Sequence, residues 1–152
     1  MHNLKSIHLL VGIFGIVVFV LTGQYMAIFL RGMIELPDGP RLLYRTSHLY
    51  LMWSSLVNLL IGFYFVAANI KLARVMQCVA SVLLLAGPPL ILAGFFLESP
   101  TNNLDRPFCG WANYFALAGV ILHVFASRKN TVDTLQLRPF SESPTNSSEI
   151  IK

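Results

Sequence analysis

The chain has 152 residues, of which 55% are hydrophobic and only 12% are charged. This composition excludes an ordinary soluble domain, in which about 25% of residues are charged, and is typical of an integral membrane protein. The formal net charge of +4 accompanies long apolar segments, so we interpret it as a topology signal and expect the lipid bilayer, and no nucleic acid, as a partner.

Four apolar segments are long enough to cross the hydrocarbon core of a bilayer, which takes about 20 helical residues. Their polarity does not alternate along the chain, so they predict helices and not the strands of a barrel. The predicted helices cover residues 7–30, 46–69, 72–97 and 109–126. The sequence therefore predicts an all-α integral membrane protein, a four-transmembrane-helix bundle within residues 1–129.

Charges beside these helices predict the orientation of the bundle. One side has a basic excess next to the membrane, made up of Lys5, Lys71, Arg74, Arg128 and Lys129, with no acidic residue among them. On the other side, four arginines and four acidic residues cancel. Because basic loops face the cytoplasm, we expect both termini to be cytoplasmic, in a multi-pass protein of a bacterial inner membrane. The Ser-, Thr-, Asn- and Pro-rich residues 130–152 predict a disordered cytoplasmic tail.

The first predicted helix has small and polar side chains on one face at helical spacing. They are His8, Gly12, Gly15, Phe19, Thr22 and Met26. Its apolar run is longer than that of a signal peptide and lacks a cleavage site, so we expect it to be retained.

The second predicted helix carries the most polar groups. Its polar face comprises Tyr44, Ser47, His48, Leu51, Ser55, Asn58, Gly62 and Asn69. The opposite face is apolar and aromatic, with Trp53 and Tyr64. Because an exposed polar group is costly in lipid, the polar face must contact other helices or a cavity.

The third predicted helix aligns Gln77, Ser81, Leu84 and Pro88 on one face. Pro88 and Pro89 remove two backbone donors, which predicts a kink at these prolines and requires other groups to satisfy the freed carbonyls. An intramembrane polar stripe of Ser55, Asn58, Gln77 and Ser81 results. We interpret it as interhelical hydrogen bonding.

The fourth predicted helix aligns Cys109, Ala112, Ala116, Gly119 and His123 on one face.

The two cysteines are expected near opposite sides of the membrane. Cys78 lies near the cytoplasmic end of the third helix and Cys109 at the outer end of the fourth. We therefore expect no disulfide between them, and no zinc site.

His8 and His123 are expected at matching depth near the cytoplasmic face, each with Gly or Ala one turn away. Two histidines across a bundle, with room for a flat macrocycle, are what a six-coordinate haem b requires. The pair is similar in kind to that of four-helix membrane cytochromes b, although no segment matches their motif. The alternative is that each imidazole hydrogen-bonds a neighbouring helix. Haem iron is the only metal that the sequence suggests.

An outer polar cluster is expected from six residues, Tyr44, Arg45, His48, Glu98, Asp105 and Arg106. One interpretation is a network that docks the loops, formed by Arg41, Arg45 and Arg106 with Glu35, Asp38, Glu98 and Asp105. The other is a pocket in which His48 and Arg45 bind an anion or a quinone-like carbonyl.

The sequence has no glycine-rich nucleotide loop, nucleophile elbow or paired carboxylates on a helix, so no motif indicates an enzyme. We therefore expect a non-catalytic accessory or interaction subunit of a larger membrane complex, with other membrane-protein subunits as partners. The first alternative is a b-type haem-binding electron-transfer protein that uses His8 and His123. The second is a small-molecule or quinone-binding protein with an outer site around His48.

Overall fold

The computed structural model describes residues 2–101 and 105–136, and over these residues the chain is helical with short connections. The long helices are α1 (His2–Ile28), α2 (Asp38–Tyr64), α3 (Lys71–Leu97) and α4 (Pro107–Gln136). A 3₁₀ turn, η1 (Arg31–Met33), lies between α1 and α2. The expected all-helical architecture is confirmed.

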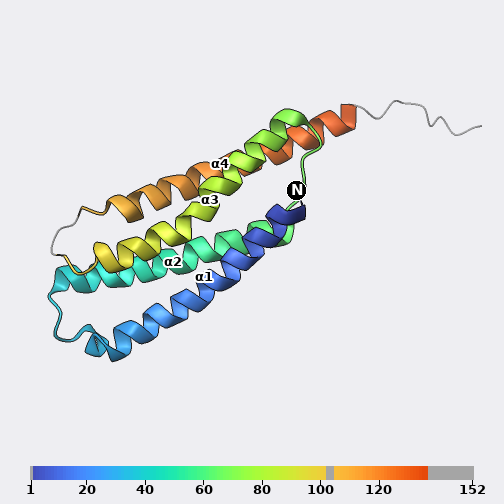
Figure 1. The fold of residues 1–152 in the computed structure, drawn as a ribbon. Helices are drawn as coiled ribbons and strands as arrows, with labels where there is room; N and C mark the ends of the chain where they lie inside the picture. The colour runs from blue at the N-terminus through green and yellow to red at the C-terminus, as the bar shows by residue number, and fades with distance from the viewer. Residues whose placement is uncertain (1, 102–104, 137–152) are drawn as a thin grey trace, which may run out of the picture.

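The helices form two antiparallel hairpins, α1 with α2 and α3 with α4, which are joined through the contact of α2 with α3 (Figure 1). One end of the bundle carries the start of α1, the α2–α3 connection and the last turns of α4. We call it the terminal end. The opposite end carries the α1–α2 and α3–α4 connections and is called the loop end.

Within the described residues, three helical segments are long and apolar enough to cross a membrane, namely Asn3–Ile28, Lys71–Leu97 and Pro107–Arg128. Helix α2 is as long as α1 and α3, at 27 residues. It is not among the three because it carries the most polar side chains. The sequence-based prediction of membrane-length helices is thus supported for α1, α3 and α4.

The polar seams predicted from the sequence face the interior of the bundle. His8, Ser55, Asn58, Gln77 and Ser81 are all almost completely buried. The exposed surface is instead apolar and aromatic, and the side chains of Trp53 and Tyr64 are 62% and 80% exposed. A polar interior within an apolar exterior is the distribution expected of helices that face lipid.

Helix α2 differs from its predicted span at both ends. It begins at Asp38 rather than at residue 46, because Pro40 falls in the first turn, where a missing N–H costs no helical hydrogen bond. It ends at Tyr64 rather than at residue 69. The Gln77 side chain holds the non-helical segment beyond, since its Nε2 donates to the Val66 carbonyl (2.8 Å) and its Oε1 accepts from the Ala68 N–H (2.9 Å).

Helix α4 extends to Gln136, beyond the predicted start of the tail at residue 130. The remainder of the predicted tail, residues 137–152, lies outside the described residues. Helix α3 remains one helix through Pro88 and Pro89.

Candidate functional site

The structure brings His8 of α1 and His123 of α4 together at the terminal end of the bundle. Their ring centroids are 6.3 Å apart and their ring planes meet at 71°. His8 is 0% and His123 is 7% exposed. The two histidines that the sequence places at matching depth are therefore neighbours in the interior.

The position of His8 depends on a proline in another helix. Pro88 has no N–H, so the carbonyl four residues earlier, that of Leu84, lacks its helical donor. The Asn58 side chain of α2 supplies one, because its Nδ2 donates to the Leu84 carbonyl at 3.1 Å. The same Nδ2 also donates to the Ser54 carbonyl at 2.9 Å.

These two carbonyls determine which way the Asn58 amide points. Carbonyl oxygens only accept hydrogen bonds, so the amide nitrogen must face them and Oδ1 must face His8. Oδ1 lies 2.8 Å from His8 Nδ1, and Nδ1 must therefore carry the proton. In the neutral imidazole, Nε2 is then an unprotonated lone pair.

The Nε2 atoms of both histidines are buried, and neither has a hydrogen-bond partner within residues 2–101 and 105–136. An unsatisfied buried polar group costs about 1–3 kcal/mol, so such atoms require an explanation. The alternative based on hydrogen bonding to a neighbouring helix thus accounts for His8 Nδ1. It does not account for either Nε2.

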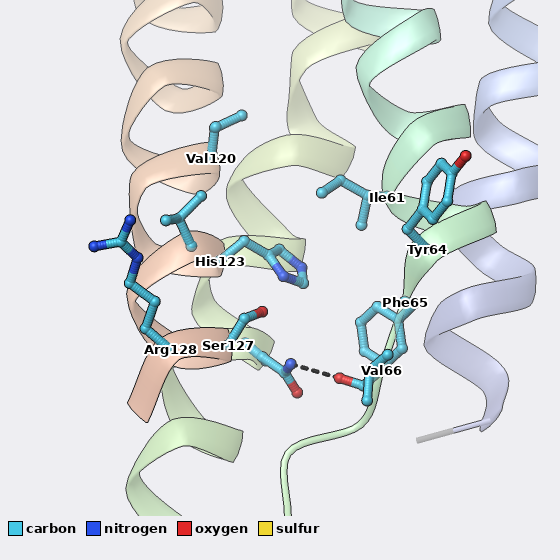
Figure 2. Close-up of a pocket in the computed structure, with 10 residues that line it drawn as sticks. Ile61, Tyr64, Phe65, Val66, Val120, His123, Ser127 and Arg128 are labelled. Carbon is cyan, nitrogen blue, oxygen red and sulfur yellow. Dashed lines mark hydrogen bonds between the residues drawn. The ribbon is translucent and has the colours of Figure 1, made fainter. Parts of the chain in front are cut away.

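A cavity of about 310 Å³ adjoins His123, between α4 and the end of α2 (Figure 2). His123 projects into it from α4, and Phe65 and Ile61 lie on the opposite wall. Its lining is mainly apolar, and Arg128 borders it with a guanidinium that points away from the cavity in Figure 2. The Phe65 ring contacts both histidines, with centroid distances of 6.4 Å to His8 and 5.7 Å to His123.

The glycines beside the histidines do not leave the open space that the sequence suggested. A Cβ atom on Gly12 would lie 2.7 Å from Leu59 Cγ, and one on Gly119 would lie 2.7 Å from Leu84 Cγ. Gly15 is covered by Ser55. This part of the prediction is wrong, because the glycines are used for close helix packing. The available space is the cavity beside Phe65.

The described residues contain no group of three His, Cys, Asp or Glu side chains that could hold a metal ion. Two imidazoles are too few for a structural zinc site, which takes four ligands. Haem iron needs only axial ligands from the protein, because the macrocycle supplies the others. A histidine pair without further ligands is therefore better suited to haem than to a bare ion.

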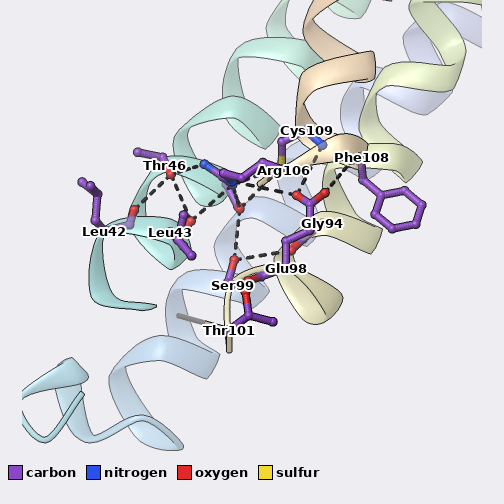
Figure 3. A network of polar contacts seen from close by, with 11 residues as sticks. Leu42, Leu43, Thr46, Gly94, Glu98, Ser99, Thr101, Arg106, Phe108 and Cys109 are labelled. Atoms are coloured by element: carbon purple, nitrogen blue, oxygen red, sulfur yellow. Dashed lines mark hydrogen bonds and ion pairs between the residues drawn. The ribbon is translucent and has the colours of Figure 1, made fainter. Parts of the chain in front are cut away.

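At the loop end, Glu98 and Arg106 form a second polar cluster (Figure 3). The Glu98 carboxylate is buried and accepts from the backbone N–H groups of Phe108 (2.5 Å) and Cys109 (3.4 Å). Because α4 begins at Pro107, these are first-turn donors without helical partners. Glu98 therefore caps α4 from the end of α3, where its negative charge also suits the helix dipole.

Arg106 links this cap to α2. Its guanidinium donates to Thr46 Oγ1 (2.6 Å) and Ser47 Oγ, contacts Cys109 Sγ at 3.1 Å and lies 3.8 Å from Glu98. Each contact joins the α3–α4 connection or α4 to a neighbouring element. This cluster has the arrangement of a structural clamp.

The other residues of the predicted outer cluster have different surroundings. His48 faces α1, where it stacks on Phe19 at 4.0 Å and hydrogen-bonds Thr22 at 2.9 Å. Tyr44 packs edge-on against Phe95, and Arg45 and Asp105 are exposed. The printed contacts thus join Glu98 with Arg106, and they connect Tyr44 and His48 to other helices.

Of the predicted docking network between the outer loops, the described residues show the buried pair of Arg106 with Glu98. Two further ion pairs among the described residues, Arg31–Glu35 and Arg41–Asp38, are local, within four residues of each other, and only the Arg41 side chain among them is partly buried. Arg41 instead donates to loop carbonyls, including those of Met33 and Leu36. Within the described part of the chain, Arg45 forms no ion pair.

The two cysteines are both free. Cys78 is exposed and Cys109 is buried, and neither is in a disulfide.

Sequence reasoning missed Phe65 and the role of Asn58. Phe65 lies in a segment that was predicted to be helical, and its contacts exist only because α2 ends earlier. The signal for Asn58 was present in part, since the freed carbonyl of Leu84 follows from Pro88.

Comparison with known proteins adds no relative, because no family model, curated protein or solved structure matches the chain.

Proposed function

We propose that this chain is a membrane protein that binds haem b between His8 and His123 and transfers single electrons. The observation that carries the proposal is the pair of buried Nε2 atoms without partners, on rings whose centroids are 6.3 Å apart. A metal atom bonded to two imidazole nitrogens at about 2 Å each holds the ring centres about 6 Å apart. The angle between the rings is unrestricted, because each ring can rotate about its own bond to the metal.

Asn58 supports this assignment through its contact with the His8 ring. A ligating histidine commonly donates its other ring N–H to a carbonyl or carboxylate, which fixes the tautomer and the ring orientation. The hydrogen bond from His8 Nδ1 to Asn58 is of this kind. Haem would supply the one-electron redox couple, and the protein contributes the ligands, their orientation and an interior from which water is excluded.

We further propose that all four helices span the membrane, with both termini in the cytoplasm. Helix α2 is compatible with a span despite its polar groups, because Ser47, Ser55 and Asn58 are buried among the other helices. Lys5, Lys71, Arg74 and Arg128 all lie toward the terminal end, where Asp133 is the one acidic residue within the described part of the chain that flanks the three membrane-length segments. This charge distribution favours a cytoplasmic terminal end.

The deciding experiment is reduced-minus-oxidised absorption spectroscopy of the purified protein, prepared from cells supplied with haem. We expect the spectrum of a six-coordinate b-type haem in the wild type, and its loss in His8→Ala and in His123→Ala. His48→Ala is the matched control, because His48 lies in the same bundle but is already paired with Thr22. This variant should retain the spectrum.

A colourless wild-type preparation would refute the haem proposal. The accessory-subunit function expected from the sequence would then be the remaining proposal. Native electrophoresis after extraction in mild detergent would test it, since an accessory subunit should migrate with a larger complex and not as a lone protomer.

A further inference from the structure

The cavity beside His123 opens on the apolar outer surface of the bundle. The side chains at its rim include Val66 and Val124, which are 70% and 50% exposed. Ile61 and Phe65 form the wall opposite His123 (Figure 2). The volume of about 310 Å³ is at the lower end of the range for small-molecule sites, about 300–1,000 Å³. The cavity therefore suits an apolar molecule of one or two rings that enters from the side.

His123 offers this cavity a hydrogen-bond donor. Its side chain projects into the cavity from α4 and forms no hydrogen bond within residues 2–101 and 105–136. Nε2 is buried, whereas Nδ1 is not, so Nδ1 is the nitrogen that a bound molecule can reach. In a neutral imidazole one nitrogen carries the proton. We place it on Nδ1, because protein interiors tolerate a donor without an acceptor less often than an acceptor without a donor.

The occupant of such a cavity must combine three properties. It must present an acceptor oxygen to the His123 N–H, since an unpaired buried donor costs about 1–3 kcal/mol. It must have a flat apolar body that packs against Phe65 and Ile61, and it must be soluble in lipid to pass the apolar rim. Water has only the first property, and a lipid acyl chain has no acceptor. The head group of a quinone has all three, because its ring carries carbonyl oxygens and an apolar tail.

We propose that this cavity binds the head group of a membrane quinone. One carbonyl oxygen accepts from the His123 Nδ1–H, the ring packs against Phe65 and Ile61, and the tail passes the exposed rim into the lipid. The quinone uses Nδ1, whereas the proposed haem would use Nε2, which also leaves the proton on Nδ1. Quinone binding thus goes beyond the proposed function and does not depend on it.

Calorimetric titration of the full-length protein in lipid nanodiscs tests the proposal, with decylubiquinone as the quinone and decylbenzene as the ligand without carbonyls. For decylubiquinone we expect saturable binding to the wild type and about tenfold weaker binding to His123→Phe, which keeps a flat ring but loses the donor. Decylbenzene should bind both proteins equally. His48→Phe is the matched control, because His48 is bonded to Thr22 and does not line the cavity. It should leave both affinities unchanged.

Two further variants separate quinone binding from haem binding. Val120 lines the cavity, so Val120→Trp should fill it and abolish saturable quinone binding, while the haem spectrum is retained. His8 does not line the cavity, so His8→Ala should lose the haem spectrum and keep the quinone affinity. Circular dichroism checks that both variants are folded.

Equal weakening of the two ligands by His123→Phe would overturn the carbonyl hydrogen bond. Unchanged quinone binding by Val120→Trp would overturn the cavity as the site. A wild type without saturable quinone binding would refute the inference whatever its haem content, and quinone binding by a colourless wild type would refute the proposed function alone.

Discussion

At the scale of single residues, Asn58 connects a carbonyl without a helical donor in α3 to the imidazole of His8 in α1. Its amide satisfies the Leu84 carbonyl that Pro88 leaves without a donor, and its oxygen accepts from His8 Nδ1. An amide is the side chain that can do both, because it has a donor and an acceptor on one carbon. A carboxylate in its place would lack the donor.

This arrangement predicts that the effects of Asn58 and Pro88 substitutions on the free energy of unfolding are not additive. Substitution of Pro89 should show no such coupling. Asn58→Leu should lower the free energy of unfolding by about 2–4 kcal/mol, because two buried groups lose their partners. In that background, Pro88→Ala should recover about 1 kcal/mol, since the new N–H can bond the Leu84 carbonyl. Unfolding in mixed detergent micelles measures both values.

Pro89→Ala is the control for this cycle, because the carbonyl that Pro89 affects is that of Leu85. Equal recovery from the two proline substitutions in the Asn58→Leu background would show that Asn58 does not specifically satisfy Leu84.

At the scale of elements, α1 and α2 are held by two reciprocal contacts near the histidine site. Leu59 of α2 covers Gly12 of α1, and Leu9 of α1 covers Gly62 of α2. A Cβ on either glycine would lie within 2.9 Å of a backbone nitrogen, 2.8 Å for Gly12 and 2.9 Å for Gly62. Backbone atoms cannot move aside as a side-chain tip can, so these glycines determine how closely the helices approach.

Gly12→Ala should therefore destabilise the bundle, although alanine is intrinsically the better helix former by about 1 kcal/mol. We expect a net loss of about 1–3 kcal/mol from the forced separation of the helices. Gly110→Ala in α4 should have no such cost, because nothing lies within 4 Å of the added Cβ. Thermal unfolding in detergent compares the two variants, and a Gly12→Ala protein as stable as Gly110→Ala would contradict the close contact.

Helix number and buried faces could be predicted from the sequence because both follow from periodicity along one chain segment. The contact of His8 with His123 was predictable only as equal depth. The partner of Asn58 was not predictable, because it depends on the relative rotation of α2 and α3. The end of α2 was missed because residues 65–68 are apolar and their non-helical conformation is held by Gln77, from outside the segment.

At the scale of the whole molecule, the proposed topology assigns each end of the bundle to one side of the membrane. Cys109, the native cysteine at the loop end, is only 1% exposed. It is too buried to be labelled, so it cannot report on the topology. In a Cys78→Ser background, Asp38→Cys should react with a membrane-impermeant maleimide in intact cells. Lys71→Cys should react only after permeabilisation, because the α2–α3 connection is then cytoplasmic. The reverse pattern would invert the topology.

The burial of the polar face of α2 also has a consequence for biogenesis. In the proposed four-span topology, α2 reaches the membrane before α3 has been synthesised, when Asn58 lacks both the Leu84 carbonyl and the packing of α3 against it. A segment in this state partitions poorly into lipid, since each unpaired polar group there costs several kcal/mol. Helix α2 should therefore stay beside the insertion machinery until α3 has been synthesised. Helices α2 and α3 would then enter the bilayer together and not one at a time.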